Sequence, residues 1–525
     1  MTLQTQAPEG DWSPFGHPLF DDPDARALSK VGVVDVGSNS VRMVVFDGAA
    51  RSPAYFYNEK IMCGLGAGLL ETGRLNVRGR KRALNALIRF AHLARGMDLP
   101  PLSVVATAAV RDASDGPAFC ADVLQQAGLT IQVISGEEEA RFSAQGVLLG
   151  WPGAYGLVCD IGGASMELAE IADGHVGRRV TSELGPLKLR DIRGGQKGRK
   201  AHIKTVMQRL QAAMGPQRDR LFLVGGSWRA IAKIDMARRG YPLAVLHEYR
   251  MTRASVRETI TFAKGMDMEQ LRARTGVSAA RIALVPYALE VLSQLLRSFK
   301  PKDIAISSYG IREGLLYEQM PQRLRNRDPL LEACRFAEAK DARLPGFGKT
   351  LYRFVSPLFK STPDARKRLI KAACLLHDVS WRAHPDYRAE VCFDNATRAN
   401  MGGLKHSERV FLGLALMQRY SSKRDSMRFD PLIGLLDEKS LRQAEILGKA
   451  MRFGAMLWPQ NDTPDDTARP TLCLYPKKKL LELTLPATAQ PLFGEVAEAR
   501  FRALARALDC DVKIRVPKGT ASQKK

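Results

Sequence analysis

Short apolar runs rich in β-branched residues recur through the first 320 residues, and small or acidic residues end each of them. The first pair of runs lies in Val31–Gly48, VGVVDVGSNSVRMVVFDG, where one apolar segment ends at Asp35 and the next ends at Asp47. Valine favours strands, whereas glycine, serine and asparagine favour tight turns, so this stretch predicts a two-stranded hairpin. The backbone N–H groups of such a turn can face an anion.

The same pattern recurs at Tyr155–Gly174, YGLVCDIGGASMELAEIADG. The matched positions are Asp35 and Asp160, Gly37 and Gly162, Ser40 and Ser165, and the Asp-Gly pairs at 47–48 and 173–174. Internal repeats reveal architecture, so two copies predict two similar halves, each with one loop able to cradle a phosphate. The alternative is two ordinary hairpins that share turn chemistry.

Strands and helices are expected to alternate through the rest of this region. In the first half we expect a loop at 58–75, helices at 76–97 and 117–127, strands at 103–107 and 131–135, and a helix from Gly136. In the second half we expect a strand, a Gly-Gly turn and a helix at 221–234, helices at 252–274 and 279–299, a strand at 303–308, and a helix at 309–320. This order predicts an α/β fold.

The pattern changes near Pro321, where PQRLRNRDP is a polar, basic linker. The predicted organisation is a disordered tail at 1–29, halves at 30–142 and 143–320, a helical domain at 328–425, a small α+β module at 430–516, and a tail at 517–525. Pro, Gly and Asp in the first tail and polar residues in the last favour disorder over packed structure.

Composition adds a strong positive charge, because 79 Lys and Arg face 55 Asp and Glu, for a net charge of +24. Such a charge attracts polyanions, and nucleic acid, an acidic membrane surface and a long phosphate polymer all fit it. The eight cysteines form no CxxC pair, so neither a zinc site nor a disulfide framework is indicated. With no run of 18 apolar residues and no secretory signal, we expect a cytoplasmic protein without a membrane span.

Arg111 directly follows the strand expected at 103–107. Ligands of open α/β sheets bind beyond the carboxyl ends of the strands, so an arginine there could clamp a phosphate. The alternative is a surface ion pair with Asp112 or Asp115.

Three carboxylates, Glu137, Glu138 and Glu139, open the helix after Gly136. Acidic residues commonly compensate the dipole at a helix N-terminus. One of the three could instead be a catalytic base, since neighbouring residues on a helix face different directions.

The second hairpin carries two acidic residues near one turn, Asp160 and Glu167. Together they could hold a divalent cation through oxygen ligands and waters, or Glu167 could simply be an outward-facing strand residue. Gly225, Gly226 and Ser227 precede a helix and form a third candidate phosphate loop.

Five segments in the order VVDVGSNSVRMVVFDG, SGEEEAR, CDIGGASMEL, VGGSWRAIAKI and YGIREGLL resemble the exopolyphosphatase/guanosine pentaphosphate phosphohydrolase family. The resemblance covers roughly residues 30–320. It implies the duplicated actin-like (ribonuclease H-like) ATPase fold, with 30–142 and 143–320 as its domains I and II. It also implies a homodimer and, through LLHDVSW, a helical domain related to the HD metal phosphohydrolases.

Through the resemblance, Glu139 matches the catalytic base, with Glu138 as its nearest rival, and Arg111 matches a phosphate-contacting arginine. Asp160 and Glu167 match positions that handle metal and water, which implies Mg²⁺ as cofactor. Asp35, Ser38, Asn39 and Ser40 match the first phosphate loop, and Gly162, Gly163 and Ser165 the second. Backbone N–H groups of Gly37–Ser40 and Gly162–Ser165 are expected to hold phosphate oxygens.

The chain departs from the family pattern in two respects. Ala164 stands where the family usually has glycine, and an alanine with a positive φ would cost about 1 kcal/mol. No histidine lies between His247 and His377, so the ligand set of an HD metal site is expected to be incomplete, with His377 and Asp378 as structural residues.

The resemblance implies processive, metal-dependent release of orthophosphate from inorganic polyphosphate. The alternatives are hydrolysis of guanosine pentaphosphate, an ATP-consuming sugar or acetate kinase, and a non-catalytic polyanion-binding scaffold silenced by Ala164.

Overall fold

Five strands form the first sheet, in the order β3-β2-β1-β4-β5. Their bounds are β1 Val31–Val36, β2 Ser40–Phe46, β3 Tyr55–Met62, β4 Ser103–Ala106 and β5 Ile131–Val133. The pairs β1–β2 and β2–β3 are antiparallel, whereas β1–β4 and β4–β5 are parallel. The structure is a computed structural model, and it describes residues 30–47, 51–217, 219–421, 427–457 and 469–516.

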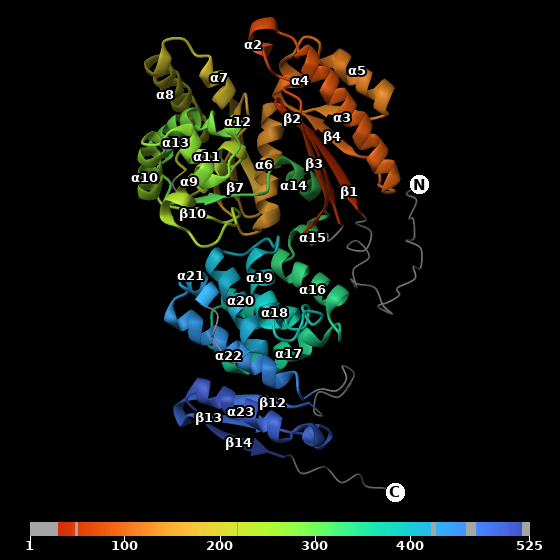
Figure 1. Ribbon diagram of the computed structural model, residues 1–525, viewed down its shortest axis with the longest axis vertical. Coiled ribbons are helices and arrows are strands. Elements are labelled where there is room, and N and C mark those ends of the chain that lie inside the picture. The colour runs from red at the N-terminus through yellow and green to blue at the C-terminus, as the bar shows by residue number, and fades with distance from the viewer. Residues whose placement is uncertain (1–29, 48–50, 218, 422–426, 458–468, 517–525) are drawn as a thin grey trace. The chain divides into compact units, whose positions relative to one another are not determined.

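The second sheet repeats the first. Its order is β10-β11-β9-β6-β7-β8, with β6 Gly156–Ile161, β7 Met166–Ala172, β8 His175–Ser182, β9 Arg220–Val224, β10 Arg250–Met251 and β11 Asp303–Ile306. The strands β8-β7-β6-β9-β11 correspond in order to β3-β2-β1-β4-β5 of the first sheet. Corresponding pairs of neighbouring strands are parallel, or antiparallel, in both sheets. β10 is an added edge strand. The predicted duplicated α/β fold is therefore confirmed (Figure 1).

The two hairpin turns at the heart of the repeat close in the same way. The Gly37 N–H donates to the Ser40 carbonyl at 3.0 Å, and the Gly162 N–H donates to the Ser165 carbonyl at 3.0 Å. Gly48, which the sequence places at the end of the first hairpin, lies outside the described residues, as do the predicted tails at 1–29 and 517–525. The turn chemistry predicted from the sequence thus produces two turns closed by the same hydrogen bond.

Each sheet has its own apolar core. Helices α3 (Val77–Gly96) and α5 (Gly116–Ala127) pack on β1, β2 and β4. Helices α8 (Gly195–Met214), α9 (Gly226–Arg239) and α13 (Val285–Phe299) pack on the second sheet. Among the described residues, 279–299 is the one segment long and apolar enough in composition to cross a membrane, and the apolar face of α13 is buried in this second core.

Helices α6 (Gly136–Gly150) and α14 (Ile311–Glu318) pack together between the two sheets (Figure 1). Glycines allow this close approach, because a β carbon at Gly146 would overlap the Gly310 carbonyl and one at Gly314 would overlap the Phe142 carbonyl. The backbones of the two helices are therefore in direct contact.

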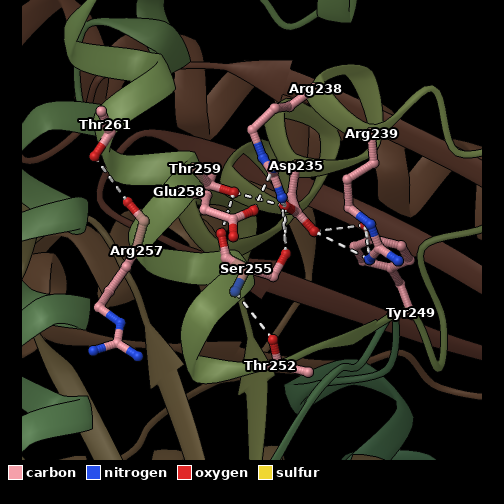
Figure 2. Close-up of polar contacts among 10 residues, drawn as sticks. All are labelled: Asp235, Arg238, Arg239, Tyr249, Thr252, Ser255, Arg257, Glu258, Thr259 and Thr261. Atoms are coloured by element: carbon pink, nitrogen blue, oxygen red, sulfur yellow. Dashed lines mark hydrogen bonds and ion pairs between the residues drawn. The ribbon is translucent and has the colours of Figure 1, made fainter.

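A buried carboxylate fixes α9 to the helix that follows it, α10 (Arg253–Lys264). Asp235 accepts hydrogen bonds from Tyr249 Oη at 2.6 Å, Ser255 Oγ at 2.7 Å and Thr259 Oγ1 at 2.6 Å (Figure 2). Burial raises the pKa of Asp235, but these hydrogen bonds outweigh burial and hold the pKa below its usual value. The ionised group anchors the helix that begins at the Gly225-Gly226 loop.

Residues from Leu330 onward form a separate unit of helices and one small sheet. Its main helices are α16 (Pro329–Asp341), α17 (Phe347–Val355), α18 (Asp364–Leu376), α19 (Arg388–Arg398), α20 (His406–Tyr420), α22 (Glu438–Gly454) and α23 (Glu495–Leu508). The sheet consists of β12 (Thr471–Tyr475), β13 (Leu480–Thr484) and β14 (Asp511–Arg515). α22 packs against both α20 and α23 and so joins the helices to the sheet.

An ion pair holds the acidic residue of the LLHDVSW segment. Arg343 Nε donates to Asp378 Oδ2 at 2.9 Å, and its Nη2 donates to Oδ1 at 2.5 Å. His377 is buried, and burial together with Arg419 lowers its pKa to about 3, so its imidazole stays neutral. This arrangement agrees with the structural role predicted for His377 and Asp378.

Two local predictions are wrong. Residues 58–75 are not one loop, because β3 continues to Met62 as an edge strand and α2 (Leu69–Thr72) follows. The helix predicted at 252–274 stops at Lys264 and a new one begins at Met268, because Asp267 caps the new start by accepting the Gln270 N–H. Local capping and edge pairing outweighed the apolar periodicity there.

Candidate functional site

A pocket of about 310 Å³ brings both hairpin turns together. A β carbon at Gly163 would lie 3.9 Å from the β carbon of Ser38, so the two turns face each other closely. The pocket is lined by the predicted loop residues Asp35, Gly37, Ser38, Asn39, Ser40, Gly162, Gly163, Ala164, Ser165, Gly226 and Ser227. The phosphate loops predicted from the sequence therefore meet in one place.

The third loop lies directly behind the second. Gly225 has a φ of 111, and a β carbon there would lie 2.9 Å from Asp160 Oδ1, so only glycine fits beside this carboxylate. Ala164 has a negative φ, and its methyl group therefore adds no backbone strain. The departure from the family pattern at Ala164 does not distort the loop.

Three carboxylates gather beside the second turn. Glu139, on the first turn of α6, lines the pocket and is only 5% exposed, and its Oε2 has no hydrogen-bond partner among the described residues. Asp160 also lines the pocket and accepts a hydrogen bond from Ser143 of α6. Glu167 is the cross-strand partner of Asp160 and lies behind the pocket wall, where Thr181 Oγ1 donates to it at 3.1 Å.

Burial and mutual repulsion make these carboxylates hard to ionise together. Burial raises the pKa of Glu139 well above its usual range, and the charges of Glu167 and Asp160 raise it further. Burial, followed by the charge of Asp160, raises the pKa of Glu167 to about 8. Burial also raises the pKa of Asp160, although the Ser143 hydroxyl opposes that rise. The cluster is suited to take up a proton or a cation.

These residues fit a magnesium ion of the kind that binds phosphates. Within the described ranges, no group of three or more His, Cys, Asp or Glu side chains is arranged to enclose a metal by protein ligands alone. Mg²⁺ commonly takes one or two carboxylates and completes its shell with waters and phosphate oxygens. The Asp160 carboxylate at the pocket wall and the unpartnered Oε2 atoms of Glu139 and Glu167 match that requirement.

Five basic side chains line the same pocket, and the sequence reasoning missed all of them. They are Arg42, Lys60, Arg229, Arg281 and Arg312. They come from β2, β3, α9, α12 (Ala279–Ile282) and α14. Only Arg42 had a readable signal, because it occupies in the first hairpin the position that Glu167 occupies in the second.

The basic groups repel one another. Burial and the charge of Arg312 lower the pKa of Arg42 to about 10, and they also lower the pKa of Arg229. Burial and the charge of Arg281 lower the pKa of Lys60. The Arg229 Nε is buried without a hydrogen-bond partner in the described structure. A bound polyanion would relieve this repulsion. Buried basic side chains that repel one another are typical of a site that binds an anion.

Two predicted catalytic residues lie elsewhere. Glu138 belongs to a capping box, in which the Ser135 N–H donates to Glu138 Oε2 at 2.8 Å and the Glu138 N–H donates to Ser135 Oγ at 3.1 Å. Arg111 is absent from the pocket wall and donates to the Ile134 carbonyl at 3.0 Å. Its Nη1 lies 3.9 Å from Glu139 Oε2, so Arg111 is a counter-charge behind Glu139.

The helix pair α6 and α14 positions the acidic and basic walls relative to each other. Glu139 lies in the first turn of α6 and Arg312 in the first turn of α14, and the two helices touch through glycines. Glu313 secures the start of α14, because it accepts the Gly310 N–H at 2.7 Å and the Tyr55 hydroxyl at 2.8 Å. The opposite charges are therefore held on one rigid pair of helices.

The duplicated sheets, with facing hairpin turns between them, define a protein of the actin-like class. A family model described as the Ppx/GppA phosphatase family matches residues 44–323, and a second, described as "Exopolyphosphatase, C-terminal", matches residues 354–511. The chain belongs to the Ppx/GppA phosphatase family and is an enzyme, a phosphoanhydride hydrolase.

Two solved structures are each similar to more than half of this chain. An exopolyphosphatase from Cytophaga hutchinsonii is 20% identical, with a TM-score of 0.50 over 57% of this chain and 99% of that chain. The Aquifex aeolicus member of the Ppx/GppA family is 22% identical, with a TM-score of 0.49 over 57% of this chain and 99% of that chain.

Proposed function

We propose that this protein is an exopolyphosphatase that removes the terminal phosphate from inorganic polyphosphate. The convergence of five basic side chains on the two facing turns carries this proposal. Five basic side chains against the three carboxylates of Asp35, Glu139 and Asp160 leave an excess of basic groups on the pocket wall, which suits several linked phosphates better than one. The net charge of +24 favours a long polyanion in the same way.

The two turns and the basic side chains hold the terminal phosphates. Backbone N–H groups of residues 38–40 and 163–165 contact the nonbridging oxygens, because the N–H groups of Gly37 and Gly162 are already used within the turns. Arg42, Arg229 and Arg312 balance the charge of these oxygens. A water oxygen attacks the terminal phosphorus, and the bond from that phosphorus to the bridging oxygen breaks. Orthophosphate and a chain shorter by one phosphate are the products. Positioning and charge balance supply most of the acceleration in such reactions.

Glu139 is the base in this scheme. It lies on the pocket wall, and its raised pKa suits a group that must accept a proton from water near neutral pH. Arg111, 3.9 Å away, limits that rise and keeps the carboxylate available. Asp160 and the free oxygen of Glu167 would hold Mg²⁺, which supplies charge stabilisation to the phosphate when bound.

Guanosine pentaphosphate is the alternative substrate within the same family. Two observations favour polyphosphate: the net charge, and the match of residues 354–511 to a model described as an exopolyphosphatase C-terminal region. The negative φ of Ala164 removes the reason for expecting a silenced, scaffold-like site. The proposal includes a cytoplasmic homodimer that acts away from membranes.

Orthophosphate release decides between these functions. The purified protein is given long-chain polyphosphate or guanosine pentaphosphate, each with and without Mg²⁺, and Glu139→Gln serves as the control. We expect rapid, Mg²⁺-dependent release from polyphosphate, slower release from the nucleotide, and almost none from Glu139→Gln. Faster release from the nucleotide would replace the proposed substrate, and binding without release would favour a scaffold. Light scattering gives the oligomeric state.

A further inference from the structure

A second and larger cavity, of about 680 Å³, lies among the helices of the second half. Its floor is apolar and is formed by Ile203, Ala263, Leu271, Ile282, Val285 and Leu289, each less than 9% exposed. Cavities of about 300–1,000 Å³ with apolar walls are typical of small-molecule sites. The floor requires an apolar or aromatic body in any ligand that binds tightly.

The rim of this cavity is basic. Lys200 and Lys204 come from α8, Lys264 from α10 and Arg297 from α13, and all four are exposed. Lys204, Lys264 and Arg297 make no ion pair or side-chain hydrogen bond among the described residues. Their charge is therefore available to an anionic ligand.

The two acidic residues of the rim, Glu290 and Asp267, already accept hydrogen bonds from other residues. Arg199 donates to Glu290 through Nε at 2.7 Å and through Nη2 at 3.0 Å, so this pair is balanced. Asp267 accepts the Gln270 N–H as a helix cap. The free charge of the rim is thus positive, and an apolar body with an anionic group complements both rim and floor.

One short segment separates this cavity from the phosphate pocket. Ala280, Arg281 and Leu284 line the phosphate pocket, whereas Ile282 and Val285 line the second cavity. Arg281 lies over the Gly225-Gly226 turn, because a β carbon at Gly226 would be 2.8 Å from Arg281 Cζ. Because Arg281 and Ile282 are neighbours in the same short helix, a shift of this segment caused by a ligand in the second cavity would also move Arg281.

We propose that this cavity binds a small amphipathic anion, with its apolar body on the floor and its phosphate, carboxylate or sulfonate group on the lysine rim. Binding repositions the segment 278–285 and thereby changes the phosphate pocket. The regulatory part rests on the proposed function, whereas the binding part does not. An acyl anion and a purine nucleotide share this chemistry, and the experiment separates them.

The probe for binding is 8-anilinonaphthalene-1-sulfonate, whose fluorescence rises in apolar sites. Two variants alter the cavity: Ser293→Trp fills it from α13, and Lys264→Glu reverses one rim charge. Lys81→Glu is the control with the same charge change, because Lys81 is an exposed residue of α3 and lies outside the cavity. We expect affinity to fall at least about fivefold in both cavity variants, as loss of a partly desolvated charge contact implies, and to stay unchanged in the control. Equal affinity in all four proteins overturns the site.

Competition identifies the kind of body that the floor accepts. Displacement of the probe by decanoate supports an acyl anion, and displacement by adenosine monophosphate supports a nucleotide. Decanol, which lacks the charge, should displace at least about tenfold more weakly than decanoate, since it cannot pair with the rim. Equal displacement by decanol and decanoate overturns the role assigned to the lysines.

Amide hydrogen exchange tests the link between the two cavities without using catalysis. Saturating probe should slow exchange of the amides at 278–285 in the wild type and leave it unchanged in Ser293→Trp. Phosphate release from polyphosphate should change with probe in the wild type alone. Unchanged exchange despite binding overturns the link. Failure of polyphosphate hydrolysis with intact binding and exchange would overturn the proposed function and leave the site standing.

Discussion

Asp160 and Glu167 face each other as cross-strand partners on β6 and β7, and both are buried. At the same register in the first half, Asp35 faces Arg42. The second hairpin thus sets a carboxylate where the first has a guanidinium, so Asp160 and Glu167 repel each other and favour uptake of a cation or a proton. The two hairpins therefore have the same backbone but a different charge beside the turn.

Replacement of Glu139 by Gln should abolish turnover while substrate binding is kept. Glutamine keeps the size of the side chain but cannot accept a proton, and loss of a general base typically lowers the rate about 10²–10⁴-fold. The measurement is phosphate release at saturating and at low polyphosphate, which separates kcat from KM. Glu138→Gln is the matched control, because glutamine can still close the capping box. Equal losses in both variants would remove Glu139 from the role of base.

Stability should depend on pH through Glu167. Its pKa is about 8 in the folded protein against 4.5 for an ordinary glutamate, so the folded state binds more protons between these values. The stabilisation is complete below about pH 4.5 and is lost as pH rises through 8. Without Mg²⁺, the free energy of unfolding should therefore fall by roughly 3–4 kcal/mol between pH 5 and pH 8.

Glu167→Gln provides the comparison, since glutamine does not titrate. Denaturant unfolding at both pH values should show a smaller decrease in the variant than in the wild type. Added Mg²⁺ should restore wild-type stability at pH 8, because a ligand of the folded state stabilises it. An identical decrease in both proteins would mean that Glu167 does not titrate in this range.

Arg229→Gln should weaken substrate binding without weakening the fold. Arg229 is buried near Arg312, and burial and that charge lower its pKa, so the free protein gains from its removal. We expect an equal or higher melting temperature and a KM for polyphosphate raised about tenfold, the loss of one charge-assisted contact. A lower melting temperature with unchanged KM would assign Arg229 a purely structural role. Thermal unfolding and steady-state kinetics provide both numbers.

Gly146→Ala should damage the contact between α6 and α14. The added methyl group would overlap the Gly310 carbonyl, and overpacking of this kind costs about 1–3 kcal/mol. Because Glu139 lies on the same helix, turnover should fall as well. Gly153→Ala is the control, since a β carbon there meets no atom within 4 Å. Unfolding curves that coincide for the two variants would show that the helices can separate freely.

Binding of long polyphosphate should weaken steeply as salt rises. Each contact between a basic side chain and a phosphate releases condensed counterions, so several contacts produce a steep dependence on ionic strength. The measurement is KM at low and at moderate salt for long chains and for tripolyphosphate. A flat response for the long chains would argue against an extended basic path outside the pocket.

The sequence predicts the loops of this site better than its charges. The turns around Asp35 and Asp160 rely on local chemistry, so their repeat could be read directly, and the resemblance identified Glu139. The pocket arginines come from separate elements and are ordinary members of a set of 79 Lys and Arg. Only folding brings Arg42, Arg281 and Arg312 together. Apart from the place of Arg42 in the repeat, no feature of their own segments distinguishes these arginines from arginines on the surface.

Arg111 is a residue whose place in the chain could be predicted from the sequence but whose side-chain partners could not. Its position after a strand was read correctly, because β4 ends at Ala106. The direction of its side chain depends on the Ile134 carbonyl and on Glu139, which belong to later segments. A residue's place in an element can be read from the pattern, whereas the partner of its side chain depends on packing.

Arg42 and Glu167 occupy the same position in the two hairpins, so the two halves of the duplicated fold differ in charge at that position. Two identical turns would accept a phosphate chain in either orientation and would have no reason to cut it at a particular bond. Because an arginine lies beside the first turn and a glutamate beside the second, the two turns offer a bound phosphate chain different charges. On the proposed function, this polarity explains why shortening would proceed one unit at a time from an end.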